Sequence, residues 1–527
     1  MNSTMGAAPG TGAKPAVNGE SAPRALSAAL YIAFCVLSVI PFAVIAQPPI
    51  VDFANHAARL NIACNIADPA IAAMYRYHLG IIPNLAVDLV NVPLCGLIAP
   101  SVVLRIVIIA SLLMIYGSAW SIQRRLFGRA NIYLLLLPAI SLNLVTTMGY
   151  INFLAGVAVA MVMIALCVRR EDDLRRLFTI GNVGGIILFF CHIFALIVAL
   201  IFFFGWLLRG RPFTPRSVVV AGLKTVAMFA VPLILIPFVA SSGHEFTAEY
   251  LGKVRLMFAL FMTQTPRLDF YGVLLFLPLW VAFRFRPVTI DPSFRLPLIL
   301  IGLYILVVPS QFQDAIDIDS RSFVALAYIF VAGVSPTVDD RRVTIGVTIG
   351  SAALVALHLA MMVANWIPFS RNVDELRGAT AVLPQHAKIL SSMDEVVRPQ
   401  PVDRLPYIHL ASYATIDRRV FNPLEFSGIG MQPLSSTEQF APFDTPAALP
   451  YSGDLMKRLN NPAPALEKDA MRKNAGFALH WAQKFDYVIY YHFGGKPNFD
   501  PVDLTIVRNG TFFSILGVKR PGPQVAH

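Results

Sequence analysis

Long apolar runs recur along the first 366 residues of this chain and are separated by short polar loops. A helix needs about 20 apolar residues to cross a bilayer, so the runs predict about eleven membrane-spanning helices. The predicted spans are 25–46, 101–120, 131–148, 151–168, 178–191, 193–208, 217–240, 270–285, 295–309, 322–335 and 344–366. The fifth and sixth are either one long tilted helix or a hairpin broken around Cys191 and His192.

Composition supports a polytopic membrane protein. The chain has 527 residues, of which 56% are hydrophobic and only 14% charged, with a mean hydropathy of +0.63. Its formal charge of +11 does not form a basic stripe with interleaved aromatic residues, which disfavours nucleic-acid binding. The absence of a Walker loop or a glycine-rich dinucleotide motif argues against an ATP-driven pump.

Arginine gathers in alternate loops, at 124–129, 169–176, 209–216, 284–295 and 341–342. Loops rich in Lys and Arg stay on the cytoplasmic side of a membrane. This pattern favours the hairpin at 178–208 and predicts a cytoplasmic N-terminus in a bacterial inner membrane. Residues 1–24, rich in Ala, Gly, Pro and Ser, are expected to form a disordered cytoplasmic tail.

The last part of the chain, 367–527, is polar and proline-rich and is expected on the outer, periplasmic side. We expect strands at 387–390, 487–491 and 512–518, and helices at 374–380 and 464–484. The predicted fold class is therefore an α-helical polytopic membrane protein, 25–366, with a small C-terminal α/β extracytoplasmic domain.

The first outer loop, 47–100, is unusually long for a connection between helices, and loops of such length are usually functional or disordered. Its composition is that of an ordered segment, with short helices expected at 57–67, 70–77 and 84–92. Cys64 and Cys95 lie in this loop and could form a disulfide in an oxidising compartment, although their spacing does not require one.

Four polar residues follow the first span closely: Asp52, Asn55, His56 and Arg59. Their spacing of i, i+3, i+4 and i+7 places them on one helix face. Ionisable groups at a membrane edge are costly to desolvate, so they indicate function. Asp52 is a candidate general base with His56 beside it. Alternatively, Asp52 only caps the helix that begins near Phe53.

Other residues of this loop are candidate ligands for a phosphate. Arg59, Arg76 and His78 could contact phosphate oxygens, for which Arg has suitable bidentate geometry. Arg76 could equally extend toward lipid head groups. Asp88 is a second acidic candidate in the same loop.

Two later outer loops add candidates. The loop 241–269 contains His244, Glu245, Lys253 and Arg255. Lys253 and Arg255 either bind the phosphate of a donor or belong to an interfacial helix that touches anionic lipid. His244 and Glu245 are further site candidates.

The loop 310–321 ends in Arg321, which could reach a phosphate or pair with one of three nearby acids, Asp314, Asp317 and Asp319. These acids could bind a divalent cation, but the spacing of a calcium-binding loop is absent. No Cys/His pattern of a metal site is present, and no cofactor is expected to be required.

In layout the chain resembles the GT-C superfamily, the multi-spanning glycosyltransferases that use polyprenyl-phosphate sugars. The shared features are Asp52 shortly after the first span, the long loop 47–100, the series of spans to 366 and the tail 367–527. The first loop lacks the adjacent Asp-Glu pair of protein mannosyltransferases, and the chain lacks the Trp-Trp-Asp motif of oligosaccharyltransferases. It is therefore loosely similar to the arabinose- and mannose-transferring branch.

The resemblance implies that a lipid-linked sugar enters from the bilayer and that its phosphate is held by Arg59, Lys253, Arg255 or Arg321. Asp52 would deprotonate or orient an acceptor hydroxyl on a saccharide, lipid or protein. The lipid phosphate would then leave, which needs neutralisation of its charge.

Two other classes remain open. A transporter or flippase for a lipid-linked saccharide would show broken helices and intramembrane charges in both halves, whereas these spans carry almost none. A non-catalytic envelope-assembly protein would use the tail as a binding module, with His409, Tyr413, Arg418 and Trp481 lining a protein interface. The alternative for these four residues is ordinary packing inside the domain.

Overall fold

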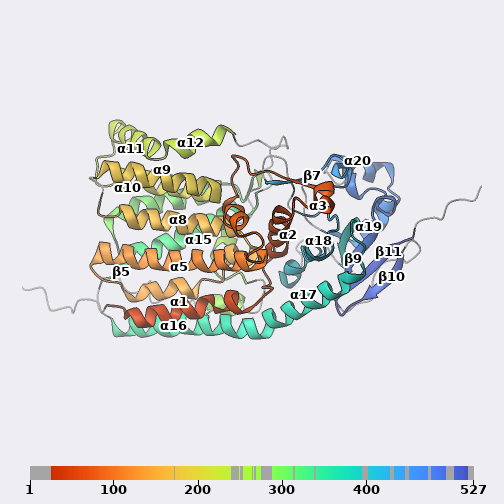
Figure 1. The fold of residues 1–527 in the computed structure, drawn as a ribbon. Coiled ribbons are helices and arrows are strands. Elements are labelled where there is room, and N and C mark those ends of the chain that lie inside the picture. The colour runs from red at the N-terminus through yellow and green to blue at the C-terminus, as the bar shows by residue number, and fades with distance from the viewer. Residues whose placement is uncertain are drawn as a thin grey trace, which may run out of the picture.

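The computed structural model describes residues 25–170, 173–238, 248–249, 253–263, 265, 269–274, 288–312, 315–337, 340–394, 402–425, 427, 432–444, 450–472, 476–493 and 504–519. The molecule is elongated. A bundle of helices fills one end, and a mixed sheet with short helices forms the other (Figure 1). The first outer loop lies between these two ends.

The bundle consists mostly of apolar helices packed side by side. Its helices are α1 (Ala28–Val44), α5 (Pro100–Phe127), η2 (Ile132–Leu135), α6 (Leu136–Ala139), α7 (Leu144–Met148), α8 (Ile151–Cys167), α9 (Leu174–Cys191), α10 (Ile193–Leu208), α11 (Pro215–Met228), α12 (Ala230–Leu235), η3 (Ile236–Phe238), η4 (Lys253–Leu260), α14 (Pro292–Val307), α15 (Ile318–Gly333) and α16 (Arg341–Met361). Two short ribbons accompany them, β2 (Ala248–Glu249) with β4 (Gln311–Phe312) and β3 (Val288–Ile290) with β5 (Val334–Pro336).

The expected count of eleven spans is not confirmed. Within the described residues, three helices are long and apolar enough to cross a membrane, and the bent pair α11 and α12 could add a fourth. Several shorter apolar helices accompany them. The predicted span 131–148 is divided into η2, α6 and α7, and the break between α6 and α7 lies at Asn143, whose side chain caps α7. Most of the predicted span 270–285 lies outside the described residues.

The chain breaks at His192, as the hairpin interpretation predicts, and does not continue as one long helix. His192 has extended backbone angles, and its Nδ1 accepts a hydrogen bond from the Phe194 N–H at the start of α10. The two helices α9 and α10 lie side by side (Figure 1). Their junction lies at the end of the bundle that faces the first outer loop.

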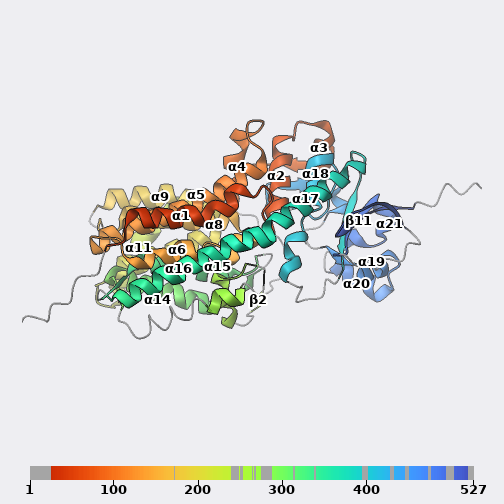
Figure 2. The same cartoon turned by 90° about the horizontal axis from the view of Figure 1, so that it is seen from below.

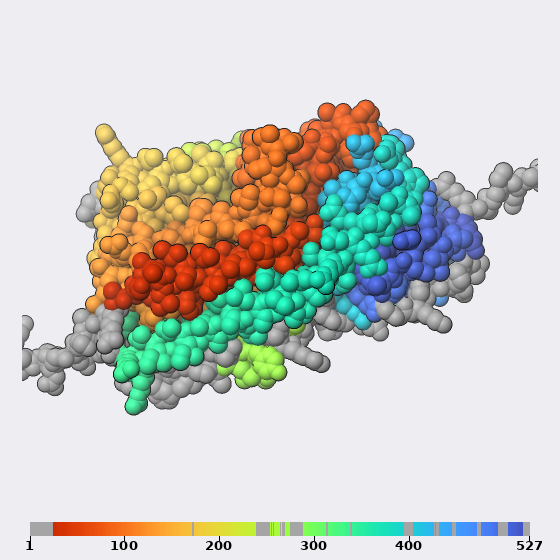
Figure 3. Space-filling view, turned by 60° about the horizontal axis from the view of Figure 1, so that its bottom comes forward, coloured from red at the N-terminus to blue at the C-terminus, as the bar shows by residue number. Residues whose placement is uncertain are grey.

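The expected boundary between residues 366 and 367 falls inside a helix. α16 continues through one turn of π-helix, η5 (Met362–Trp366), into α17 (Ile367–Ala379) and η6 (Thr380–Val382). Figure 2 shows this helix running from the bundle to the sheet, and Figure 3 shows it as a ridge beside α1. A continuous helix therefore connects the membrane part to the tail.

The first outer loop folds into short helices close to the expected ones. They are α2 (Phe53–Cys64), α3 (Pro69–Met74), α4 (Ala86–Asn91) and η1 (Val92–Leu94), with the strand β1 (Tyr75–Tyr77) between α3 and α4. β1 pairs with β7 (Leu434–Ser436) of the tail in antiparallel register. Side chains from both segments share a small apolar core, including Ile62 and Tyr75 from the loop and Phe421 from the tail. Loop and tail are thus one packed unit.

The tail is a small α/β unit, as the sequence predicts. Its sheet has the order β10-β11-β9-β6-β8, antiparallel from β10 to β9 and parallel from β9 to β8. The strands are β6 (Ile389–Met393), β8 (Tyr451–Ser452), β9 (Tyr487–Tyr491), β10 (Leu504–Asn509) and β11 (Phe513–Val518). The helices are η7 (Val402–Tyr407), α18 (Ser412–Arg418), η8 (Ala441–Phe443), α19 (Gly453–Asn460), α20 (Pro464–Arg472), η9 (Gly476–Ala478) and α21 (Trp481–Lys484).

Candidate functional site

The turn that carries Asp52 is held against the junction of α7 and α8. The backbone N–H groups of Val51 and Asp52 donate to the carbonyls of Thr147 (3.0 Å) and Met148 (3.1 Å). Gly149 follows with φ +89°, and a Cβ there would lie 2.9 Å from the Cβ of Asp52. Only glycine combines this left-handed conformation with so close an approach. The position of Asp52 is therefore fixed by backbone contacts.

Asp52 precedes α2 but does not cap it with its side chain. The structure thus gives no support to the alternative in which Asp52 is only a helix cap. Its carboxylate is 16% exposed, and Oδ1 lies 3.6 Å from Nε2 of the buried His409. Burial raises the pKa of Asp52 to about 7, opposed by Arg321 and reinforced by Asp317. A carboxyl with such a pKa suits general base catalysis near neutral pH.

Asn55 links α2 to the tail. Its Nδ2 donates to the carbonyl of Leu424 (2.8 Å) and lies 3.4 Å from Nδ1 of His409. Asn55 is fully buried, and its neighbours Val51 and Ala54 belong to the same apolar core as the tail helices. The tail therefore contacts the first turn of α2, directly after Asp52.

His56 is buried on the same helix. Burial lowers its pKa well below the ordinary value, and Arg59 adds to the effect. The imidazole is therefore neutral at physiological pH. Its hydrogen bond to the backbone of Gly149 connects α2 to the turn that positions Asp52.

Arg321, in the first turn of α15, is a buried cation with unused hydrogen-bonding capacity. Its Cζ lies 3.3 Å from the ring centroid of Tyr150, and its side chain is 7% exposed. Nη1 lies 3.2 Å from Nε2 of His192, while Nε has no partner. Among the described residues, no carboxylate lies within 4 Å of it. A guanidinium has five N–H donors, so Arg321 retains several for an anion.

Tyr150 lies between acidic and basic groups of the site and contacts both Asp317 and Arg321. Its hydroxyl donates to Oδ2 of Asp317 at 2.7 Å, while its ring supports Arg321. Asp317 precedes α15 in a left-handed conformation with φ +56°, which is uncommon outside glycine and tends to occur at functional sites. Tyr150 also interacts electrostatically with Asp52. Asp52, Tyr150, Asp317 and Arg321 thus form one cluster.

Lys253 of η4 lies near the start of α15 and is already paired. Its Nζ donates to Oδ2 of Asp319 (2.8 Å) and to the carbonyl of Val308 (2.6 Å), and its side chain is 23% exposed. Ser310 donates to the same carboxylate oxygen at 2.7 Å. The side chain of Arg255 is outside the described part of the structure, as are His244 and Glu245.

Arg59 and Asp88 form an ion pair in which both side chains are fully buried, with Nη2 and Oδ2 2.7 Å apart. Arg59 also donates to Gln432 of the tail (2.6 Å), and Tyr77 donates to Asp88 (3.0 Å). The Arg59 side chain thus binds Asp88 within the loop and Gln432 in the tail. This geometry favours a structural role for Arg59 and Asp88 over direct phosphate contact.

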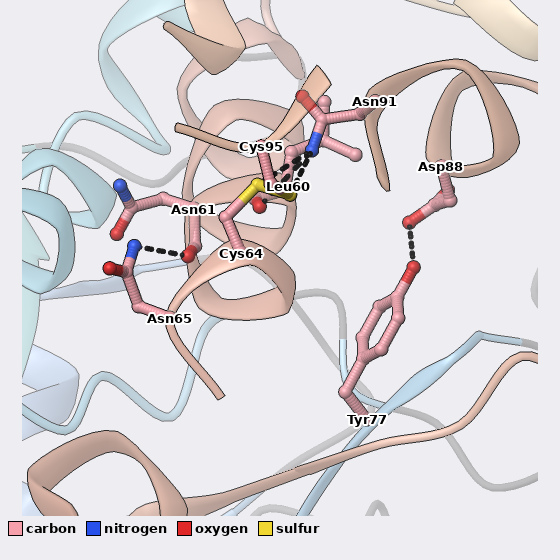
Figure 4. The surroundings of a disulfide bond; sticks show 8 residues. All are labelled: Leu60, Asn61, Cys64, Asn65, Tyr77, Asp88, Asn91 and Cys95. Carbon is pink, nitrogen blue, oxygen red and sulfur yellow. Dashed lines mark hydrogen bonds between the residues drawn. A yellow bond between two sulfur atoms is a disulfide. The ribbon is translucent and has the colours of Figure 1, made fainter. Parts of the chain in front are cut away.

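A disulfide joins the end of α2 to the residue that follows η1 in the first outer loop. Cys64, at the end of α2, is bonded to Cys95. Asn91 donates to the carbonyl of Leu60 (3.4 Å) beside it, and Figure 4 shows these residues with the Tyr77 to Asp88 hydrogen bond nearby. The bond closes a segment of the loop that includes α3, β1 and α4.

Arg76 and His78 lie away from the cluster. Both are exposed; Arg76 is 3.6 Å from Glu438 of the tail, in a pair whose members are both accessible to solvent. The structure therefore does not bring them together with Asp52. Among the described residues, no group of three metal-ligating side chains occurs.

Sequence reasoning singled out Asp52 and Arg321 but did not place Tyr150 or His409 beside them. His409 lies 354 residues from its neighbour Asn55, and no local pattern signals such a contact. The suggestion that His409, Tyr413 and Trp481 line a protein interface is wrong, because all three are buried inside the chain. Arg418 is half-buried and donates to the carbonyl of Leu383.

No protein-family model matches the chain, and no curated protein matches it. Among solved structures, the chain is similar to the crystal structure of ArnT from Cupriavidus metallidurans in the apo state. The sequence identity is 11%, the TM-score is 0.49, and the similarity covers 93% of this chain and 97% of that one.

Proposed function

We propose that this chain is an integral membrane glycosyltransferase that moves a sugar from a polyprenyl-phosphate donor to a hydroxyl group on the outer side of the membrane. The observation that carries the proposal is the cluster at the end of the bundle. There, the partly exposed carboxylate of Asp52, with a pKa of about 7, interacts with Tyr150, and the ring of Tyr150 contacts the buried guanidinium of Arg321. Within the described part of the chain, that guanidinium has no carboxylate partner. A base and an anion-binding group side by side are what the transfer requires.

In this reaction the acceptor hydroxyl attacks the anomeric carbon of the sugar. A new bond forms between that carbon and the acceptor oxygen, and the bond from the carbon to the phosphate oxygen breaks. The electron pair of the broken bond leaves with the polyprenyl phosphate. The hydroxyl proton passes to the Asp52 carboxylate, so charge and atoms balance. Arg321 neutralises the charge that develops on the departing phosphate.

We assign the phosphate to Arg321 first because, unlike Arg59, Arg76 and Lys253, it has no carboxylate partner among the described residues. Lys253 is held by Asp319, yet its partial exposure allows it to serve as a second contact at the rim. Arg59, fully buried against Asp88, instead holds the loop in shape. Asn55 and His56 hold α2 against the tail and against Gly149.

The donor is proposed to be lipid-linked because the cluster lies where apolar helices meet the outer unit (Figure 1). A polyprenyl chain can remain among the exposed apolar side chains of the bundle while its phosphate reaches Arg321. We propose a bacterial inner-membrane location, with a saccharide, lipid or protein as the acceptor.

The test is sugar transfer in membranes that contain wild type or Asp52→Asn, with radiolabelled polyprenyl-phosphate arabinose or mannose as the donor. We expect transfer by the variant to fall by about 10²- to 10⁴-fold, the usual contribution of a general base. Asn has nearly the same shape, so the fold should persist.

Asp68→Asn is the matched control. Asp68 caps α3 in the same loop and pairs with Arg419 of the tail at 2.9 Å, but it is not part of the cluster. The control should transfer at nearly the wild-type rate, since Asn is also a good cap. Equal transfer by wild type and Asp52→Asn would contradict the assignment. Passage of the intact donor across the membrane without cleavage would favour a flippase instead.

A further inference from the structure

His409 belongs to the tail and lies beside Asp52. It lies in the turn between η7 and α18, where its carbonyl accepts a hydrogen bond from the Ser412 N–H at 3.0 Å. Its side chain is almost fully buried, and Nε2 is 3.6 Å from Oδ1 of Asp52. That distance is longer than a hydrogen bond, as catalytic contacts often are before substrate binds.

The hydrogen bonds around Asn55 determine which nitrogen of His409 carries a proton. The carbonyl of Leu424 can only accept, so the group of Asn55 that lies 2.8 Å from it must be the amide NH₂. The same Nδ2 lies 3.4 Å from Nδ1 of His409. Nδ1 therefore accepts, and the proton of a neutral imidazole lies on Nε2, the nitrogen that faces Asp52.

Burial keeps this imidazole neutral, because it lowers the pKa of His409 to about 3. A neutral donor can orient a carboxylate without adding a positive charge. No second cation then lies beside Asp52, and the positive charge of Arg321 remains available to an anion. An ionised histidine at the same place would compete for the carboxylate.

We propose that His409 is a positioning residue supplied by the tail: its Nε2–H orients the carboxylate of Asp52 toward the acceptor, and Asn55 fixes the tautomer that makes this possible. The proposal rests on the proposed function and deepens it. The tail then completes the catalytic site, and its role extends beyond covering the outer loop.

The test compares His409→Asn with His409→Gln. The amide of Asn occupies the place of Nδ1 and does not reach Asp52, whereas the longer Gln places an N–H near the position of Nε2. Both variants are polar, so neither leaves an apolar side chain in a polar site. The rate of sugar transfer is measured against pH with the donor that wild type uses, radiolabelled polyprenyl-phosphate arabinose or mannose.

The pH profile reports on Asp52 in its full surroundings. Arg321 and Arg59 favour its ionised form and Asp317 opposes it, while His409, His56 and Tyr150 are the other titratable groups of the cluster. Loss of the N–H donor removes a contact that favours the carboxylate. In His409→Asn we expect the acidic limb of the pH–rate profile to shift to higher pH by about half to one unit. One net hydrogen bond produces a shift of this size.

We expect the kcat of His409→Asn to fall about tenfold, which is the effect of losing one oriented contact of about 1.4 kcal/mol, with the KM for the donor unchanged. His409→Gln should restore most of the kcat and most of the wild-type pH profile. The control is His492→Asn, at a half-buried histidine of the same tail beside β9. Its pH profile should match wild type.

A His409→Asn variant with the wild-type pH profile and kcat would overturn the inference, as would a loss of rate that is equal at every pH and not restored by Gln. The proposed function is tested separately by Asp52→Asn. If that variant is inactive while His409→Asn behaves as wild type, only the role of His409 fails. If Asp52→Asn remains active, the proposed function itself fails.

Discussion

Asp52 and Arg321 differ in their pairing from two other pairs of ionisable groups, Arg59 with Asp88 and Lys253 with Asp319. Each of these two pairs is joined by a contact shorter than 3 Å. Buried pairs of this kind are costly to break, because one charge is left behind. Asp52 and Arg321 interact electrostatically but have no close counter-ion of their own among the described residues. Ionisable groups held in this way are typical of catalytic sites.

The pKa of Asp52 leads to a prediction about pH. The proposed base must be ionised to accept a proton, and burial raises its pKa to about 7. Transfer should therefore be slow below pH 6, rise through pH 7 and level off above pH 8. The measurement is the initial rate of sugar transfer between pH 5 and pH 9, with donor binding followed in parallel. A rate that is already maximal at pH 5 would contradict this role.

At the scale of elements, the junction of α7 and α8 determines where Asp52 lies. Gly149 has no room for a side chain, since a Cβ would also lie 3.1 Å from the backbone nitrogen of Asp52. The Asp52 turn, the hydrogen bond of His56 and the ring of Tyr150 all meet at this point. A small displacement here should move the carboxylate away from Arg321.

Gly149→Ala should therefore reduce both activity and stability. Left-handed strain and the contact with Asp52 together should lower the free energy of unfolding by about 1–3 kcal/mol, and transfer should fall by at least about tenfold. Gly128→Ala is the control, because Gly128 has φ +72° but a Cβ added there would meet no atom within 4 Å. It should lose stability but keep its activity. Equal losses of activity in the two variants would contradict a special role for the junction.

Much of the fold could be predicted from periodicity, but contacts between distant segments could not. The tail strands at 487–491 and 513–518 and the break at His192 were predictable, because alternation and local polarity signal them. Asp52 and Arg321 were identifiable as charges beside apolar runs. His409, Gly149 and Tyr150 were not assigned to the site, since their roles depend on packing between segments far apart in sequence. The pairing of Arg59 with Asp88 likewise depends on how the loop folds back.

At the scale of the whole molecule, the outer loop and the tail act as one unit that is joined to the bundle through α1, α5 and the continuous α16–α17 helix (Figure 2). The loop and the tail share a pair of strands and an apolar core, and His409 of the tail lies beside Asp52 of the loop. A disulfide such as Cys64–Cys95 is typical of an oxidising compartment, in line with the outer location that we propose for this unit. The arginine-rich loops predict the same orientation.

The disulfide provides a test of this orientation. A membrane-impermeant thiol reagent applied to the outer side should label the protein only after reduction, because Cys35, Cys167 and Cys191 are buried. The Cys64→Ser/Cys95→Ser variant should remain unlabelled, and loss of the cross-link should destabilise it by about 3 kcal/mol. Labelling without reduction would exclude the disulfide. Labelling of the reduced protein only from the cytoplasmic side would show that the loop faces the cytoplasm and would contradict the proposed topology.

The most direct test of the central claim is the fate of the donor lipid. Purified protein in lipid vesicles is mixed with polyprenyl-phosphate arabinose or mannose and a membrane extract that supplies acceptors, and the lipids are analysed by mass spectrometry. The account predicts that wild type releases free polyprenyl phosphate as sugar appears on an acceptor, and that Asp52→Asn leaves the donor intact. Donor that stays intact with wild type, when its insertion into the vesicles is verified, would contradict the claim.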